Sequence, residues 1–317
     1  MSQADQPFEH RPVMVDEIVA LLGPVPAGSI VDATVGGGGH SRAILRAHPH
    51  LRIIGLDRDA DAITAAGKAL APFGDRVSLH RTRFDGLGGV LDDEGIPTIS
   101  GALFDLGVSS PQFDRVDRGF SYRGEAPLDM RMDQRDGRTA ANVINELSVT
   151  ELADLLAANG EGRFAGRIAR AIVRDRPITT TTQLAEVVRD AIPAPARRTG
   201  GHPAKRTFQA LRIEVNSELE VLPVALDAAM ERLVEGGRIA VLSYHSGEDR
   251  IVKERFLAAA DAPCTCPPRM PCGCGAAERR TFRLPHRGAR KPSAIEVESN
   301  PRSESARLRT IEKLAKP

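Results

Sequence analysis

A run of four glycines at positions 36–39 follows a short β-branched segment, 29–35, and limits the possible folds of this chain more than any other feature. Glycines after a strand let the backbone take positive φ angles and pass close to a ligand, while the next helix start offers free N–H groups. The pattern predicts a strand, a turn and a helix around a nucleotide-like ligand. A tight turn without any ligand is the alternative interpretation.

The segments around this turn alternate in the way that is typical of a parallel sheet covered by helices. Residues 100–106 and 238–244 are predicted as further central strands. The remaining expected strands are 51–57, 76–80 and 305–311, and the expected helices are 41–47, 60–71 and 84–92. The sequence therefore predicts the α/β class with a Rossmann-like sheet.

A long stretch separates the strands expected at 100–106 and 238–244, and it exceeds any normal crossover connection. Much of it, from 149 to 229, has the apolar period of amphipathic helices. We therefore expect an inserted helical domain at 113–215, between two parts of the sheet domain at 1–112 and 216–317. A chain of 317 residues is long enough for both.

Composition places the chain among ordinary globular proteins, with 41% hydrophobic and 27% charged residues. Residues 1–12 lack the pattern of a signal peptide, and the longest apolar stretch, 18–22, is far shorter than the roughly 20 residues that span a bilayer. We therefore expect a cytoplasmic protein without a membrane partner. The net charge of +1 means that binding to nucleic acid would depend on local basic clusters.

The acids near the glycines narrow the choice of ligand. A triphosphate loop is excluded because no Lys-Ser or Lys-Thr pair follows the glycines. A dinucleotide remains possible, since Asp57 stands at the distance of a ribose-binding acid, although Ser41 replaces the third glycine. Asp32, Asp57 and Asp105 at strand ends favour S-adenosylmethionine, because carboxylates accept hydrogen bonds from ribose and ammonium groups and suit a sulfonium. Solvated acids beside a plain turn are the structural alternative.

Residues 103–112, Leu-Phe-Asp-Leu-Gly-Val-Ser-Ser-Pro-Gln, lie at the carboxyl edge of a central strand, where open α/β sheets place their active sites. The segment is similar to the loop of enzymes that methylate exocyclic amines of bases. Asp105, Ser109 and Ser110 are candidates to hold the protons of such an amine and direct its lone pair. Methylation of a ring carbon would need a thiolate, and all four cysteines lie far along the chain, so a nitrogen or oxygen acceptor is favoured. A plain turn at 109–111 is the alternative.

Several longer segments occur in an order that identifies a family. They are His-Arg-Pro-Val at 10–13, Gly-Gly-His-Ser at 38–41, Asp-Leu-Gly-Val-Ser-Ser-Pro at 105–111, Arg-Gly-Phe-Ser at 118–121, Pro-Leu-Asp-Met-Arg-Met-Asp at 127–133, His-Pro at 202–203, Arg-Thr-Phe-Gln-Ala-Leu-Arg-Ile at 206–213, Val-Asn at 215–216 and Ser-Tyr-His-Ser at 243–246. With these the chain resembles the bacterial 16S ribosomal RNA cytosine-N4 methyltransferases, the RsmH or MraW family. The resemblance implies a class I methyltransferase sheet with an inserted helical domain, 113–215, that recognises the substrate. It also implies S-adenosylmethionine as donor and a decoding-centre cytidine of the small ribosomal subunit as acceptor.

The resemblance also assigns roles to single residues. Tyr244 and Gly247 depart from the Phe and Leu that are usual in the family, and the packing of that loop is expected to differ. His245 between them is a candidate to contact the target base or accept a proton, with a structural histidine as the alternative. The cofactor contacts that the resemblance implies are Gly38, Gly39, His40, Asp57, Phe84, which would flank the adenine, Asp105 and Gln112, whereas Gly36 and Gly37 are expected to serve the backbone bend.

Basic residues cluster within 160–215, where 11 Arg or Lys stand against 5 Asp or Glu. Such stripes suit contacts with RNA phosphates, and a solvated helix face is the alternative. The expected RNA contacts are Arg163, Arg167, Arg170 and Arg174, which share one helix face, and Lys205 and Arg206 in a second basic group, while Phe164, Ile168 and Ile172 line the adjacent, packed face.

The cysteines are confined to eleven residues, as Cys264, Cys266, Cys272 and Cys274. In a reducing compartment such a cluster suggests a structural zinc before disulfides, although the Cys-X-Cys pairs are tighter than the usual knuckle. A cluster without metal is the alternative, and no catalytic metal is expected.

The combined prediction is N4-methylation of a 16S rRNA cytidine within the small ribosomal subunit. Three other functions remain open from the residues themselves: a methyltransferase acting on DNA or protein, a non-enzymatic RNA-binding module with the same fold, and an NAD-dependent oxidoreductase.

Overall fold

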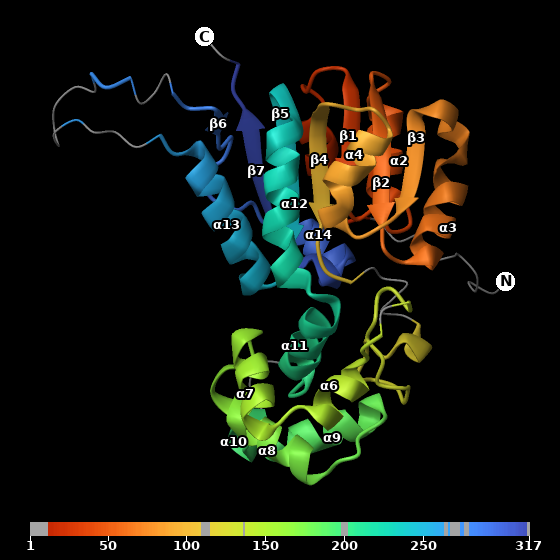
Figure 1. Ribbon diagram of the computed structural model, residues 1–317, viewed down its shortest axis with the longest axis vertical. Helices are drawn as coiled ribbons and strands as arrows, with labels where there is room; N and C mark the ends of the chain where they lie inside the picture. The colour runs from red at the N-terminus through yellow and green to blue at the C-terminus, as the bar shows by residue number, and fades with distance from the viewer. Residues whose placement is uncertain are drawn as a thin grey trace. The chain divides into compact units, whose positions relative to one another are not determined.

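The computed structural model describes residues 12–108, 115–135, 137–197, 202–262, 266, 273–275 and 279–315. Its internal contacts divide the chain into two compact units (Figure 1). One, the sheet unit, combines Met1–Gly107 with Val221–Pro317, and the other, the helical unit, is Val108–Glu220. The helical unit thus lies between the two parts of the sheet unit in sequence. It spans 108–220, whereas the insert was predicted at 113–215.

The sheet unit contains a seven-stranded sheet in the order β3-β2-β1-β4-β5-β7-β6. The strands are β1 (Gly28–Asp32), β2 (Leu51–Asp57), β3 (Val77–Arg81), β4 (Ile99–Asp105), β5 (Leu233–Ser243), β6 (Phe282–Arg283) and β7 (Arg307–Lys313). The first five pair in parallel, whereas β7 runs antiparallel to β5 and β6 antiparallel to β7. Strand order reverses between β1 and β4, the point at which open α/β sheets bind ligands. The predicted α/β class is confirmed.

Helices cover both faces of this sheet because the strands are apolar on both sides. Alternate residues such as Val31 and Phe104 pack with α4, α12 and α13, while Ile30 and Leu103 pack with α1, α2 and α3 (Figure 1). The helices are α1 (Val15–Leu22), α2 (Gly39–Ala47), α3 (Ala60–Leu70), α4 (Leu87–Asp93), α12 (Glu218–Arg232), α13 (Ser246–Ala260) and α14 (Ala294–Ser299), with short 3₁₀ turns η1 (Ala71–Arg76), η2 (Phe84–Gly86) and η5 (Pro301–Ser303).

The helical unit has its own apolar core, in which Leu152, Ile168, Leu184 and Leu211 are fully buried. Capping boxes begin three of its helices, with Thr139, Ser148 and Thr180 as the N-cap residues. Its elements are η3 (Val116–Arg118), α6 (Ala140–Glu146), α7 (Val149–Ala158), η4 (Gly162–Phe164), α8 (Ala165–Arg174), α9 (Thr181–Ala191), α10 (Ala194–Arg197) and α11 (Lys205–Asn216).

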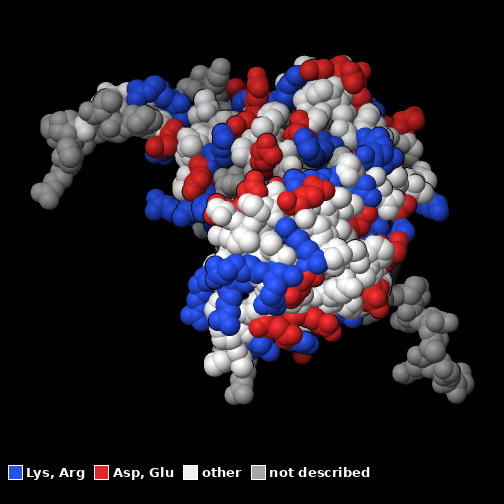
Figure 2. All heavy atoms as spheres, turned by 60° about the horizontal axis from the view of Figure 1, so that its bottom comes forward, with Lys and Arg blue, Asp and Glu red and all other residues white. Residues whose placement is uncertain are grey.

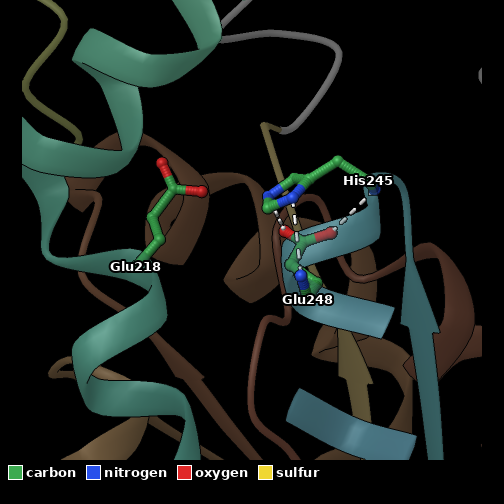
Figure 3. Close-up of side chains that lie close together, drawn as sticks. All are labelled: Glu218, His245 and Glu248. Carbon is green, nitrogen blue, oxygen red and sulfur yellow. Dashed lines mark hydrogen bonds and ion pairs between the residues drawn. The ribbon is translucent and has the colours of Figure 1, made fainter. Parts of the chain in front are cut away.

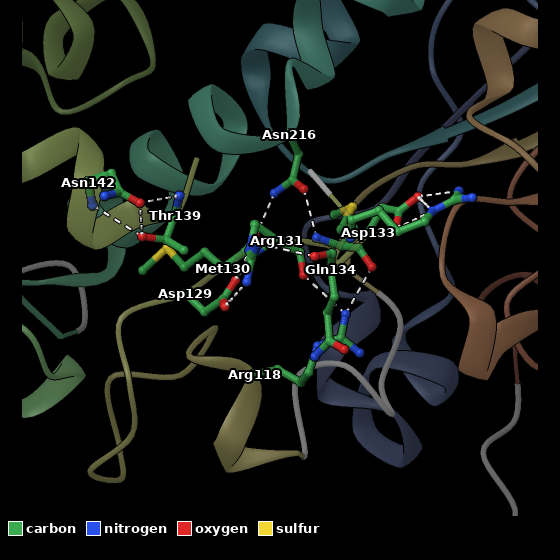
Figure 4. A network of polar contacts seen from close by, with 11 residues as sticks. Arg118, Asp129, Met130, Arg131, Asp133, Gln134, Thr139, Asn142 and Asn216 are labelled. Carbon is green, nitrogen blue, oxygen red and sulfur yellow. Dashed lines mark hydrogen bonds and ion pairs between the residues drawn. The ribbon is translucent and has the colours of Figure 1, made fainter. Parts of the chain in front are cut away.

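The segment 127–133 of the helical unit follows an irregular path, with Met130 at a φ of 62°. Asn216, at the end of α11, supports this path by donating from Nδ2 to the Met130 carbonyl at 2.8 Å and accepting from the Met132 amide at 2.9 Å (Figure 4). Arg118 donates to the carbonyls of Arg131 and Met132. Residues 127–133, one of the segments in which the sequence resembles the family, therefore form a loop that is held in place by hydrogen bonds.

Among the helices that the structure describes, none is both long and apolar enough to cross a bilayer.

Candidate functional site

The glycine turn joins the end of β1 to the start of α2, as the sequence predicts. Gly36 and Gly38 have φ angles of 51° and 79°, which L-residues rarely adopt. Gly39 has an ordinary φ, but a Cβ there would come within 2.5 Å of the Pro12 ring. Gly37 has neither constraint, and a Cβ at Gly37 would meet no atom within 4 Å. The four glycines thus serve different purposes, and the backbone at Gly37 borders open space.

Two carboxylates, of the buried Asp32 and the half-buried Asp57, hold this turn through hydrogen bonds. Asp57 accepts hydrogen bonds from the Gly36 amide at 3.0 Å and the Asp59 amide at 2.9 Å, and burial raises the pKa of Asp57 to about 6. Asp32 is 1% exposed and accepts from the Ser41 hydroxyl at 2.6 Å, and burial raises its pKa as well. Burial disfavours the charged form of each carboxylate, and a cation or hydroxyl donor bound beside one of them would favour that form again.

Asp105 ends β4 beside β1, and three side chains from other elements surround it. Its amide donates to Thr34 Oγ1 at 2.7 Å, and the Tyr244 hydroxyl donates to its Oδ1 at 2.7 Å. His40 Nε2 lies 3.5 Å from its other carboxylate oxygen. Burial and the charge of Asp105 raise the pKa of Tyr244 well above its ordinary value, so Tyr244 remains a donor. Sequence reasoning did not assign Thr34 or Tyr244 to the site.

His40 is the most unusual group at this edge. It is only 6% exposed, yet neither ring nitrogen makes a hydrogen bond with any residue that the structure describes. Buried polar atoms normally have partners, so an unsatisfied imidazole beside a glycine turn indicates a place for a polar ligand. Phe84, the predicted adenine neighbour, is half-buried in η2 and contacts Phe104 edge to face with ring centroids 6.1 Å apart.

Three predicted residues, Ser109, Ser110 and Gln112, lie outside the described residues.

His245 is the N-cap residue of α13. Its Nδ1 accepts from the Glu248 amide at 3.4 Å, and Glu248 in return accepts from the His245 amide at 3.3 Å (Figure 3). His245 Nε2 is buried and lies 3.2 Å from Oε1 of the same Glu248, in a contact that does not have hydrogen-bond geometry. Both ring nitrogens of His245 therefore face Glu248, and Nδ1 has a structural role in helix capping. Glu218, also drawn in Figure 3, accepts two hydrogen bonds of 2.8 Å from Arg212.

The zinc prediction gains no support. Cys266 and Cys274 are half-buried and form no disulfide, whereas Cys264 and Cys272 lie outside the described residues. Within the described part of the chain, no group with metal-ligand geometry includes a cysteine.

The predicted basic face is exposed on η4 and α8, and Ile168 and Ile172 are buried on the opposite side. Figure 2 shows Lys and Arg side chains gathered in a broad patch at the lower left of the view, bordered below by acidic side chains. Arg174 donates two hydrogen bonds of 2.7 Å to Asp175, and Arg163 stacks over the Phe164 ring. Arg167, Arg170, Lys205 and Arg206 are exposed and form no ion pair within the described residues.

Comparisons with known proteins identify the family of this chain. A chain from Mycobacterium sp. (strain KMS) named ribosomal RNA small subunit methyltransferase H is 54% identical over 316 residues, covering 97% of this chain and 85% of the relative. A protein of the same name from Symbiobacterium thermophilum is 52% identical, covering 97% of each chain. The crystal structure of an rRNA methylase from Streptococcus thermophilus matches with a TM-score of 0.43 at 12% identity, covering 99% of this chain and 100% of that one. The family model described as the MraW methylase family matches residues 7–314, and the chain belongs to that family.

Proposed function

We propose that this protein transfers a methyl group from S-adenosylmethionine to the N4 amine of a cytidine in the decoding centre of 16S rRNA, within the small ribosomal subunit. Membership of the MraW methylase family and the names of the relatives support this substrate. The observation that carries the proposal is the ring of polar groups at the sheet switch point, where the buried and unsatisfied His40 lies 3.5 Å from Asp105. The small ribosomal subunit would be its partner, which would place the activity in the cytoplasm.

The residues at the glycine turn fit S-adenosylmethionine, which supplies an electrophilic methyl group on a sulfonium. Gly38, Gly39 and His40 would contact it from the start of α2, and Asp57 would accept from its ribose while holding the Gly36 amide. Phe84, half-buried beside this edge, would flank the adenine, and Gln112 would add a further contact. The His40 ring, whose nitrogens have no hydrogen-bond partner among the described residues, supports a polar occupant.

Asp105 would act on the methyl acceptor. A cytosine amine is conjugated with its ring, so an acceptor for its protons favours the form whose lone pair points at the methyl group. Tyr244 occupies Oδ1 of Asp105 and fixes the direction of the carboxylate, which leaves Oδ2 for the amine or for His40. Ser109 and Ser110 would add hydroxyl oxygens from the following loop, and the His245 ring, whose Nε2 lies 3.2 Å from Glu248 Oε1, would contact the base. Most of the rate acceleration would come from aligning the sulfonium methyl group with the amine. Such proximity can lower the barrier by roughly 7–11 kcal/mol.

The helical unit would bind the RNA backbone through its exposed cations. Lys205 and Arg206 begin α11, and Arg163, Arg167, Arg170 and Arg174 follow the exposed face of η4 and α8. Replacing Arg167 and Arg170 together with Ala should lower the slope of log affinity against log salt by roughly 0.7 per lost single-strand phosphate contact. Arg46→Ala, which removes an exposed cation on α2 of the sheet unit, is the control and should leave the slope unchanged.

The deciding experiment incubates the protein with methyl-labelled S-adenosylmethionine and small subunits from cells that lack the enzyme. Nucleoside mass spectrometry should then find N4-methylcytidine at a single position. Label on carbon 5 of a pyrimidine, on protein only, or on no cytidine would refute the proposal, and binding of NAD without methyl transfer would favour an oxidoreductase. A parallel reaction with free 16S rRNA tests whether the assembled subunit is required.

A further inference from the structure

Two aromatic rings stack at the surface of the helical unit, in a chain that has no Trp and only two Tyr. The rings of Tyr122 and His202 lie nearly parallel, with centroids 4.2 Å apart and an angle of 9°. On the core side, Tyr122 contacts the buried ring of Phe208 edge to face at 5.7 Å. The stack therefore leads from the core to an exposed imidazole, His202, whose position is set by the ring beneath it.

An open cavity adjoins this stack. Tyr122, Arg123, His202 and Lys205 line a volume of about 550 Å³. Sites for small organic ligands usually occupy roughly 300–1,000 Å³, so the space suits a group the size of a nucleotide.

The charges of Arg123 and Lys205 and the tautomer of His202 also favour a nucleotide as the ligand. Arg123 and Lys205 are exposed, and neither pairs with a carboxylate in the described residues. Partial burial and the charges of Arg123 and Arg189 lower the pKa of His202, so its ring is neutral at physiological pH. Because Nδ1 accepts from the Ala204 amide at 3.2 Å, the proton of the neutral ring lies on Nε2, which remains a donor. The cavity thus combines a flat neutral ring, one donor and two cations.

We propose that Tyr122, His202, Arg123 and Lys205 form a binding site for one unpaired nucleotide of a single-stranded RNA segment. The base stacks on His202, and the flanking phosphates bind Arg123 and Lys205. Aromatic platforms beside cations are the general means by which proteins hold single strands, and stacking accepts any base. The identification of RNA as the natural ligand rests on the proposed function. An acidic peptide would use the cations but would gain nothing from the exposed ring face.

The test compares a short fluorescein-labelled oligouridylate with an abasic oligomer of the same length, by anisotropy and without S-adenosylmethionine. The wild-type protein should bind the oligouridylate more tightly. His202→Ala should weaken that binding roughly 5- to 100-fold, the range of one base stack, without weakening the abasic oligomer or changing the salt slope. Arg123→Ala and Lys205→Ala should each lower the slope by roughly 0.7 and keep the preference for bases.

Two conservative variants and one control variant test whether a loss of binding reflects unfolding of the protein. Tyr122→Phe and His202→Phe keep the stack and should keep the preference for the oligouridylate, while Arg46→Ala, an exposed cation on α2 of the sheet unit, should leave both slope and preference unchanged. Equal binding of both oligomers by the wild-type protein, or oligouridylate binding unaffected by His202→Ala, would overturn the site. Methylation by the wild-type protein is scored separately, so a binding site without methyl transfer would count against the proposed function only.

Discussion

Replacing Asn216 with Ala should destabilise the helical unit strongly, because its side chain supports the segment 127–133 from within the core. Asn216 is 1% exposed and connects the Met130 carbonyl and the Met132 amide through hydrogen bonds of 2.8 and 2.9 Å. Both residues are buried, so Ala leaves one acceptor and one donor without partners. At roughly 1–3 kcal/mol for each such group, and with some relief from an entering water, we expect a loss of about 2–4 kcal/mol.

Asn216→Asp distinguishes the effect of the side-chain donor, Nδ2, from the effect of the acceptor, Oδ1. The carboxylate keeps an acceptor for the Met132 amide but turns a second oxygen toward the Met130 carbonyl, which accepts at present from Nδ2. Burial would raise the pKa of this introduced Asp in the folded state above its unfolded value of about 3.9. Protonation would restore a donor, so the variant should be most stable below about pH 4 and lose stability as the pH rises toward the folded pKa.

Urea unfolding followed by circular dichroism measures the loss, and hydrogen exchange of the peptide over 127–133 locates it. Exchange of the Met132 amide should accelerate in Asn216→Ala far more than exchange in β2 or β4 of the sheet unit, which serve as internal controls. An unfolding midpoint and an exchange rate at Met132 equal to wild type would refute this account of Asn216.

Three further predictions concern the sheet unit. Gly36→Ala should lower thermal stability, by about 1 kcal/mol for a φ of 51°, whereas Gly37→Ala should leave it unchanged because a Cβ there meets no atom within 4 Å; equal melting temperatures of the two variants would contradict this difference. Tyr244→Phe removes the hydrogen bond to Asp105 and should slow single-turnover methyl transfer roughly 3- to 10-fold, with unchanged cofactor affinity. The pKa of Asp57 rises from 3.8 to about 6 on folding, worth about 3 kcal/mol at 1.36 kcal/mol per unit, so its contribution to stability is greatest below pH 3.8 and is lost as the pH rises to about 6. Ribose hydroxyls that donate to Asp57 should release its proton, and calorimetry near pH 6 in buffers of different ionisation enthalpy should detect this release in wild type and not in Asp57→Asn.

The sequence by itself was sufficient for most of the sheet, because its strands are apolar on both faces and end in recognisable turns. Residues 51–57 form β2 as expected, and the expected strand at 100–106 differs from β4 by one residue at each end. Several elements were not predicted, among them α1 and β6. α1 is only eight residues long and has no side-chain N-cap, and β6 has two residues, too few for any period.

The tertiary structure alone decided which side chains act together. Thr34 and Tyr244 lie 71 and 139 residues from Asp105 along the chain, and they reach it only because β1 and β5 both pair with β4. Tyr244 looked like a departure from the family in the sequence and is a partner of the central acid in the fold.

The histidines and arginines also differ in how much of their role the sequence predicts and how much depends on the fold. Periodicity was enough to predict an exposed basic face on α8, because the buried face alternates with it along the helix. The pairing of Arg174 with Asp175, the capping contact of His245 and the lack of a hydrogen-bond partner for His40 among the described residues depend on side-chain directions that a linear pattern does not encode. The chain sequence thus determined the residue types and the sheet edge of the site, and the packing of distant elements determined which atoms remain free to bind a ligand.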